Sequence, residues 1–203
     1  DRLGDWLLSQ SEHPLNPEQR RTLERFCAGL ARLPFASPDP ALRGAYHKVL
    51  SRQVRRLPAA AASPQRVFGE GGMDRFPVRE NGLRFELSFA EGYSVGLFLD
   101  QRENRRRFLA NHVARDFPLF PNGPADAEVL NTFAYTCGFS VCATLAGARV
   151  TSLDLSKKYL EWGRRNFALN DLDPAAHDSI YGDAFDWLRR LAKKGRAFDV
   201  VIL

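Results

Sequence analysis

The sequence contains few of the residues that build disulfide scaffolds and metal sites. Its 203 residues include three cysteines, Cys27, Cys137 and Cys142, whose spacing fits neither a zinc site nor a disulfide framework. The histidines are scattered, without partner spacing for metal or triad chemistry: His13, His47, His112 and His177. We therefore predict no metal site, and reduced thiols of the kind found in the cytoplasm or in an organelle matrix.

Long hydrophobic runs are also missing. No apolar stretch approaches the roughly 18 residues that suggest a membrane-spanning helix, so we predict no membrane association. With 44% hydrophobic and 26% charged residues, the composition excludes the disordered and low-complexity classes. Lysine and arginine outnumber aspartate and glutamate by 29 to 24, a net charge of +5 that is compatible with an anionic partner.

The positive charge is concentrated in two segments. Residues 41–66 have six basic residues and no acidic one, namely Arg43, Lys48, Arg52, Arg55, Arg56 and Arg66. Residues 101–115 have five arginines against Glu103. Segregated charge of this kind is typical of surfaces that contact a phosphate backbone. The alternative interpretation is a solvated helix face for the first segment and a buried arginine paired with Asp100 for the second.

The first third of the chain has a helical pattern. Asn16, Pro17 and Gln19 supply an N-cap, a proline at the first helical position and a capping-box partner. A second helix is predicted from apolar residues at helical spacing: Leu42, Tyr46, Val49, Leu50 and Val54. We therefore predict an N-terminal helical region over residues 1–66, with a proline-flanked linker at 59–64.

The period changes to two in the middle of the chain. Residues 76–80 and 83–87 alternate around Asn81-Gly82, which predicts a β-hairpin with a type I′ turn. A further strand is predicted over residues 93–99, and a basic helix from Asp100. Residues 67–123 are thus expected to form a hairpin and strand with a basic helix, ending at the Pro-Asn-Gly-Pro sequence at 121–124.

Strands and helices alternate after Pro124. Strands are predicted at 128–132, 149–153, 179–181 and 198–203, and helices at 138–146, 156–169 and 184–194. This alternation is typical of an α/β fold with a parallel sheet and helices on both faces. Residues 124–203 are therefore predicted to form one α/β domain.

Ligands of such sheets bind outside the carboxyl ends of the strands. The first predicted strand runs into a loop at 131–138, the second ends at Asp154, and Asp183 follows the third. An acid after the second strand can accept hydrogen bonds from ribose hydroxyls, and a helix cap beside Ser156 is the alternative. An adenine amino group could be recognised near Asp183.

The loop at 131–138 has one glycine, Gly138, where a dinucleotide site requires the pattern G-x-G-x-x-G. Phe133 and Tyr135 occupy positions where a pyrophosphate would need open space. A nicotinamide-dependent protein is therefore disfavoured. A nucleoside ligand without a pyrophosphate, S-adenosylmethionine, fits the loop better.

Three stretches of sequence carry a resemblance: VLNTFAYTCGFS at 129–140, GLFLDQRENR at 96–105, and SLDLS at 152–156, with Asn166 and Asn170 downstream. Together they resemble the ribosomal RNA large subunit methyltransferase I family of class I S-adenosylmethionine-dependent methyltransferases. The resemblance extends from about residue 76 to residue 203. It implies a Rossmann-like class I methyltransferase fold, with S-adenosylmethionine as cofactor and ribosomal RNA as partner.

The resemblance also implies roles for individual residues. The cofactor-binding residues would be Asn131, Phe133, Ala134, Tyr135, Thr136, Gly138, Asp154, Leu155, Ser156, Asp183, Ala184 and Phe185. On the RNA side would lie Asp100, Gln101, Arg102 and Arg105. The implied reaction is methylation of cytosine C5 in rRNA. Methylation of another RNA base position and a noncatalytic RNA-binding module remain as alternatives.

The sequence departs from the family in three places. Many members have glycine where this chain has Cys137, and the first 57 residues do not resemble the PUA-type RNA-binding domain with which members typically begin. In the family an Asp-Pro-Pro signature follows the strand at 198–203. We therefore expect a C-terminally incomplete sheet, catalytic residues beyond Leu203 and no activity of this chain alone. The open edge of that strand could be covered in a homodimer.

Overall fold

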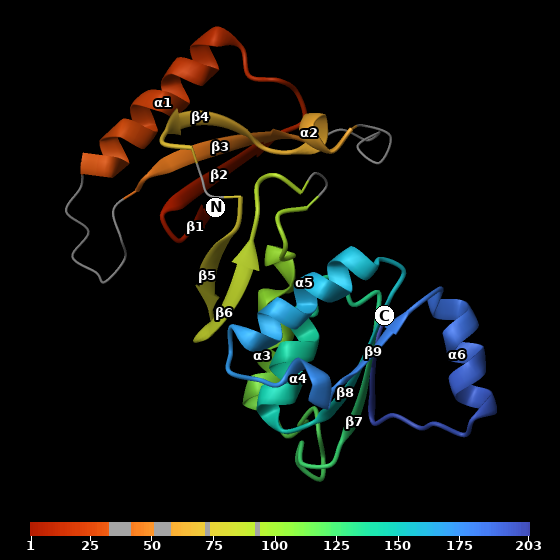
Figure 1. The fold of residues 1–203 in the computed structure, drawn as a ribbon. Helices are drawn as coiled ribbons and strands as arrows, with labels where there is room; N and C mark the ends of the chain where they lie inside the picture. Colours follow the sequence, from red (N-terminus) through yellow and green to blue (C-terminus); the bar gives the residue numbers. More distant parts are fainter. Residues whose placement is uncertain (33–41, 51–57, 72–73, 92–93) are drawn as a thin grey trace. The chain divides into compact units, whose positions relative to one another are not determined.

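The computed structural model describes residues 1–32, 42–50, 58–71, 74–91 and 94–203. The chain forms two compact units (Figure 1). The first unit consists of Asp1–Arg79 and Leu87–Gly96, and the second of Glu80–Glu86 and Leu97–Leu203. No helix among the described residues is long and apolar enough to cross a membrane.

The first unit is built on a four-stranded sheet. Its strands, in the order β1-β2-β3-β4, are Arg2–Leu3, Trp6–Ser11, Gly44–Val49 and Gln65–Gly69. Strands β2 and β3 are parallel, whereas β1 and β4 pair antiparallel to their neighbours. Helix α1 (Pro17–Arg32) lies against one face (Figure 1), and a core of Cys27, Leu42, Ala45 and Val67 fills the space beneath it. The short helix α2 spans Ala59–Ala62.

The first predicted helix is confirmed together with its capping box. The amide of Gln19 donates to Asn16 Oδ1 at 2.8 Å, and the amide of Asn16 donates to Gln19 Oε1 at 3.0 Å. These reciprocal bonds satisfy two backbone donors that the start of a helix otherwise leaves without partners.

The second predicted helix is wrong, and residues 1–66 are therefore not a helical region. Residues 44–49 form strand β3, in which Tyr46 pairs with Leu8 of β2. Both faces of β3 are covered, since Ala45 lies in the core under α1 while the ring of Tyr46 stacks on Phe89 at 4.2 Å. A strand covered on both faces loses its alternation of apolar and polar residues. Val54, Arg52, Arg55 and Arg56 lie outside the described residues.

The predicted hairpin is confirmed. Strands β5 (Phe76–Glu80) and β6 (Leu83–Leu87) are joined through Asn81 and Gly82, which have the positive φ values, 52° and 84°, that a type I′ turn requires. The strand expected over 93–99 is absent where the chain is described: residue 93 lies outside, and residues 94–98 are irregular. A 3₁₀ turn, η2 (Leu99–Gln101), precedes helix α3 (Arg102–Ala110), so the helix begins two residues after Asp100.

The second unit contains a parallel sheet in the order β10-β7-β8-β9. Its strands are β7 (Glu128–Thr132), β8 (Arg149–Asp154), β9 (Asp178–Tyr181) and β10 (Val200–Ile202). Its helices are α4 (Gly138–Ala146), α5 (Lys157–Ala168) and α6 (Ala184–Lys193), with a 3₁₀ turn η3 (Pro174–Ala176) before β9. Helices α4 and α5 lie on one face of the sheet and α6 on the other (Figure 1).

The elements predicted for residues 124–203 are confirmed to within about two residues at each end. The cap predicted for α5 is also present, because Ser156 Oγ accepts from the amide of Tyr159 at 3.3 Å. Strand β10 forms one edge of the sheet. Pairing of that edge with a second copy stays a prediction.

Candidate functional site

The candidate site lies where the direction of the sheet reverses. From β7 the chain passes through α4 to β8 on one side, while β10, which follows α6, pairs with β7 on the other side. Such a switch point opens a crevice at the carboxyl ends of the strands, where ligands of α/β sheets bind. At this edge the loop at 133–137 follows β7, Asp154 is the last residue of β8, and Asp183 follows β9.

The loop after β7 has an unusual backbone. Phe133, Tyr135 and Cys137 have φ values of 54°, 51° and 60°, in the left-handed region that bulky residues rarely adopt. Hydrogen bonds of its backbone amides hold it from within and from the end of β8: Ala134 N donates to Leu153 O at 3.0 Å, Cys137 N to Ala134 O at 2.8 Å, and Tyr135 N to Asp154 Oδ2 at 2.8 Å. The end of β8 therefore fixes the shape of the loop.

Asp154 organises the site through both of its carboxylate oxygens. Oδ2 accepts from the amide of Tyr135 and Oδ1 from the amide of Ser156, each at 2.8 Å. Because Ser156 itself caps α5, Asp154 is not the helix cap that the alternative interpretation proposed. A carboxylate has about four lone-pair positions, so each oxygen keeps capacity for another donor.

Several predicted loop residues support the loop from below. Asn131 is buried and donates from Nδ2 to Ser140 Oγ at 2.9 Å, and Ser140 Oγ lies 2.8 Å from Ser152 Oγ. Ala134, Thr136 and Gly138 are buried as well. These four predicted cofactor-binding residues are therefore buried beneath the loop, where they support its backbone instead of facing solvent.

Cys137 lies inside this supporting layer. Burial raises the pKa of its thiol to about 12, an effect that hydrogen bonds with Ser152 and Ser140 only partly oppose. The thiol is therefore protonated at neutral pH and is no nucleophile. Burial also raises the pKa of the Cys142 thiol to about 12.

Apolar side chains stand open on the outer side of the loop. Phe133, Leu155 and Phe185 are 59%, 67% and 62% exposed, and each follows a different strand of the sheet. The rings of Phe133 and Phe185 meet edge to face with centroids 6.3 Å apart. Asp183 beside them caps α6, with Oδ1 accepting from the amide of Asp186 at 3.1 Å. The site thus combines an exposed apolar surface with two carboxylates, Asp154 and Asp183.

The segment before α3 lies against this loop. A Cβ at Gly138 would approach Leu97 Cδ1 to 3.0 Å, so only glycine allows this close packing without a shift. Asp100 is exposed and accepts from Gln101 Nε2 at 2.8 Å, and Arg102 is also exposed. RNA contact by these three residues stays a prediction.

The placement of Arg105 on the RNA side is contradicted by the structure. Its side chain is 2% exposed and donates from Nε and Nη2 to the two carboxylate oxygens of Glu80, at 2.7 and 2.8 Å. It also donates to the carbonyl oxygen of Phe98 at 2.9 Å. Arg105 therefore ties α3 to β5 instead of facing solvent. Of the other arginines predicted to form the second basic segment, Arg106 pairs with Glu103 at 2.9 Å.

Sequence reasoning missed the roles of two asparagines, Asn166 on α5 and Asn170 just beyond the end of that helix. Asn166 is fully buried, donates from Nδ2 to Thr136 O and accepts at Oδ1 from the amide of Glu86, both at 2.8 Å. It thereby joins β6 to the loop after β7. Asn170, one helical turn later, bonds both backbone groups of Arg84, at 2.9 Å to N–H and 2.7 Å to C=O. The sequence offers two signals for them, their spacing of four residues and their place among the residues that carry the family resemblance.

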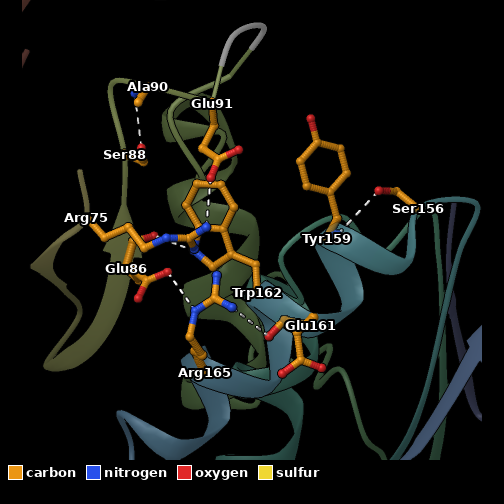
Figure 2. A network of polar contacts seen from close by, with 10 residues as sticks. All are labelled: Arg75, Glu86, Ser88, Ala90, Glu91, Ser156, Tyr159, Glu161, Trp162 and Arg165. Atoms are coloured by element: carbon orange, nitrogen blue, oxygen red, sulfur yellow. Dashed lines mark hydrogen bonds and ion pairs between the residues drawn. The ribbon is translucent and has the colours of Figure 1, made fainter. Parts of the chain in front are cut away.

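Figure 2 shows further contacts of α5 with β6. Arg165 Nε lies 2.9 Å from Glu86 Oε1, and Trp162 Nε1 donates to the carbonyl of Glu86 at 3.1 Å. Together with Asn166, these bonds fix β6 on the surface of α5. Figure 2 also shows the ion pair between Arg75 and Glu91, which belongs to the first unit. Its N–O distance is 2.8 Å.

Comparison with known proteins identifies the family. The model of a family described as S-adenosylmethionine-dependent methyltransferase matches residues 4–203. The chain belongs to this family. Its parallel sheet is accordingly the Rossmann-like sheet of class I methyltransferases, as the sequence predicted.

Individual relatives of this methyltransferase chain agree. A protein named ribosomal RNA large subunit methyltransferase, from Deinococcus radiodurans, is 38% identical over 193 residues, which cover 92% of this chain and 41% of that protein. Ribosomal RNA large subunit methyltransferase K from Neisseria meningitidis serogroup B is 34% identical over 136 residues, 66% of this chain and 35% of that protein.

A solved structure of SMU.776 complexed with S-adenosylhomocysteine superposes with a TM-score of 0.74 and 26% identity, covering 99% of this chain and 46% of that one. The chain therefore spans less than half the length of these relatives. Membership of the methyltransferase I subgroup in particular stays a prediction.

Proposed function

We propose that the intact protein transfers a methyl group from S-adenosylmethionine to a base of large-subunit ribosomal RNA, and that residues 124–203 hold the cofactor. The observation that carries the proposal is the geometry of Asp154, whose two oxygens are oriented by backbone amides at 2.8 Å and keep open lone pairs. The names of the relatives support the RNA substrate.

The residues at the site fit the parts of this cofactor. The open lone pairs of Asp154 suit the two hydroxyls of a ribose. Phe133, Leu155 and Phe185 offer exposed apolar surface for a purine ring, and the second oxygen of Asp183 can accept from an amino group. Helix α4 begins at the cofactor loop, and the side chain of its N-cap residue, Cys137, makes no capping hydrogen bond. The first backbone amides of α4 therefore favour the carboxylate of the cofactor's amino-acid part.

When bound, the cofactor supplies an electrophilic methyl group on a sulfonium. The side chains of this chain bind and orient it. Asp154 positions the ribose and the loop together, while Asn166 and the Glu80–Arg105 pair hold β6 and α3 next to that loop. This rigid support is what a transfer reaction needs, because the reacting atoms must be held within a narrow range of geometry.

The finer proposal, methylation at cytosine C5, rests on the resemblance of residues 129–140. A thiolate must first add to C6 in that reaction. All three cysteines of the chain are buried, and burial raises the pKa of each thiol. The C5 reaction therefore requires a cysteine outside residues 1–203. A nitrogen of guanine or adenine, which needs no thiolate, is the second candidate.

Calorimetry on the intact protein with S-adenosylhomocysteine tests cofactor binding. We expect saturable binding that Asp154→Ala weakens at least tenfold. Asp173→Ala is the matched control, because Asp173 likewise accepts from a backbone amide two residues later, at 2.9 Å, but precedes η3. Absence of binding, or equal affinity of the two variants, contradicts the proposal.

Mass spectrometry of nucleosides from 23S-type rRNA of a deletion strain tests the reaction. Loss of 5-methylcytidine supports cytosine C5, and loss of a methylated guanosine or adenosine supports the second candidate. An unchanged set of methylated nucleosides, with RNA binding retained, supports a noncatalytic RNA-binding module instead.

A further inference from the structure

The first unit contains a groove between α1 and its edge strand β4. The groove has a volume of about 670 Å³ and lies open to solvent. It is lined by Arg21, Glu24, Arg25 and Ala28 of α1 and by Val67, Phe68 and Gly69 of β4. We call it the α1–β4 groove. Its size is within the range of about 300–1,000 Å³ that is typical of ligand sites.

Two arginines give the groove its charge. Arg21 and Arg25 are four residues apart, so their side chains stand next to each other on the same face of α1. Both are exposed, and neither has an ion-pair partner among the residues that the structure describes. The acidic residue beside them, Glu24, is held by Arg20, whose Nε lies 3.1 Å from Glu24 Oε1. Two guanidinium groups therefore remain available to an anionic ligand.

The floor of the groove is apolar. Val67 is buried in the core beneath α1, and Phe68 packs against that core while remaining partly exposed. Ala28 adds a small side chain from the helix. An aromatic surface flanked by arginines matches what single-stranded nucleic acids require, because bases stack on aromatic rings while phosphates pair with basic groups.

We propose that the α1–β4 groove binds a single-stranded segment of the RNA substrate, with phosphates on Arg21 and Arg25 and a base against Phe68. This rests on the proposed function in taking RNA as the substrate. A groove for lipid headgroups would not need the aromatic floor. A groove for an acidic protein segment would share the arginines, so the test separates this occupant from RNA.

The experiment uses the intact protein and a fluorescein-labelled single-stranded RNA oligonucleotide in anisotropy titrations at several salt concentrations. For the double variant Arg21→Gln/Arg25→Gln we expect at least a tenfold weaker affinity. The slope of log affinity against log salt should become shallower by about 1.4, since each phosphate on a single strand contributes about 0.7. Phe68→Leu should weaken binding with an unchanged slope.

Lys193→Gln/Lys194→Gln is the matched control, because it removes the same charge from an exposed site at the end of α6 in the second unit. An equal effect of this control would assign the loss to net charge and overturn the proposal. A glutamate-rich peptide that binds with the same dependence on Arg21 and Arg25 would assign the groove to an acidic protein and also overturn it.

The outcomes distinguish this inference from the proposed function. If the intact protein methylates RNA and the groove variant binds RNA as the wild type does, the groove proposal falls and the function stands. If the groove variant loses RNA affinity while S-adenosylhomocysteine binds as before, both are supported. If the wild type binds no RNA, both fall.

Discussion

Cys137 fills the space that a side chain at residue 163 would need. A Cβ at Gly163 would clash with Cys137 Sγ and lie 2.9 Å from Cys137 Cβ, closer than real Cβ contacts come. The glycine on α5 and the cysteine at the start of α4 are therefore complementary in size. We expect Gly163→Ala to lower the free energy of unfolding by about 2 kcal/mol, a typical cost of overpacking.

The same substitution should cost less than half as much in a Cys137→Gly background, because the clashing atoms are then gone. Urea denaturation of the four proteins in this cycle measures the coupling. Gly29→Ala on α1 is the control, since a Cβ there meets nothing within 4 Å. Simple additivity of the two substitutions would contradict the interpretation.

The buried ion pair between Glu80 and Arg105 predicts a large effect of removing one partner. Glu80→Gln leaves the Arg105 guanidinium buried without its counter-charge, which costs about 3–5 kcal/mol of stability. Glu103→Gln, which breaks the exposed pair with Arg106, should change stability little. Chemical denaturation of both variants checks the contrast, and equal effects would contradict the assigned burial of the Glu80 pair.

Asn166 predicts a link between β6 and the cofactor loop. In Asn166→Ala the amide of Glu86 and the carbonyl of Thr136 lose their partners inside the protein, at a cost of about 2 kcal/mol. Because Thr136 belongs to the loop that Asp154 orients, we also expect weaker S-adenosylhomocysteine binding by calorimetry. Asn104→Ala, which removes the side-chain bonds of this α3 residue with Gln101 and Arg107, is the control. A loss of stability with unchanged affinity would mean that Asn166 supports the fold alone.

His47 predicts a loss of stability in mild acid. Burial lowers the pKa of its imidazole below the ordinary 6.5, and Ser9 Oγ and Ser11 Oγ lie 2.8 and 3.0 Å from its two ring nitrogens. Below pH 6.5 the unfolded chain binds a proton that the folded chain resists, so the stability contributed by His47 falls as the pH falls. It is fully present above 6.5.

Denaturation midpoints at pH 7.5 and 5.5 check this for the wild type and His47→Gln. The wild type should lose more stability between the two pH values than the variant does. His177, whose pKa is also lowered by burial, contributes equally to both proteins and cancels in the comparison. A variant with the same pH dependence as the wild type would exclude His47 as the titrating group.

Most of the second unit was predictable because its signals are local. The cap at Ser156, the Asn81-Gly82 turn and the glycine that ends α4 at Gly147 each act within a few residues of where they stand. Strand β3 was missed because its cover comes from α1 and from Phe89, both distant in the sequence. The sequence of residues 44–49 contains no signal that either of these neighbours covers the strand.

The candidate site divides in the same way. The position of Asp154 followed from the strand pattern, whereas the burial of Arg105 depends on Glu80, 25 residues earlier on the hairpin. The left-handed backbone of Phe133 and Tyr135 has no sequence signal either, since bulky residues are poor predictors of that conformation. Side-chain pairs between residues distant in the sequence, and strained backbone conformations, could therefore not be predicted from the sequence.

The strand order of the second unit also has a consequence for synthesis. Val200 of β10 pairs with Val129 of β7, whereas β7, β8 and β9 are joined in sequence. A ribosome adds about 5–20 residues per second. The loop and Asp154 are therefore synthesised several seconds before β10, and Asp183 is synthesised shortly before it. The cofactor-binding edge can therefore assemble on the emerging chain before β10 pairs with β7 on the other side. Pulse-labelling hydrogen exchange on ribosome-bound chains would contradict this order if amides of β7 gained no protection until β10 had emerged.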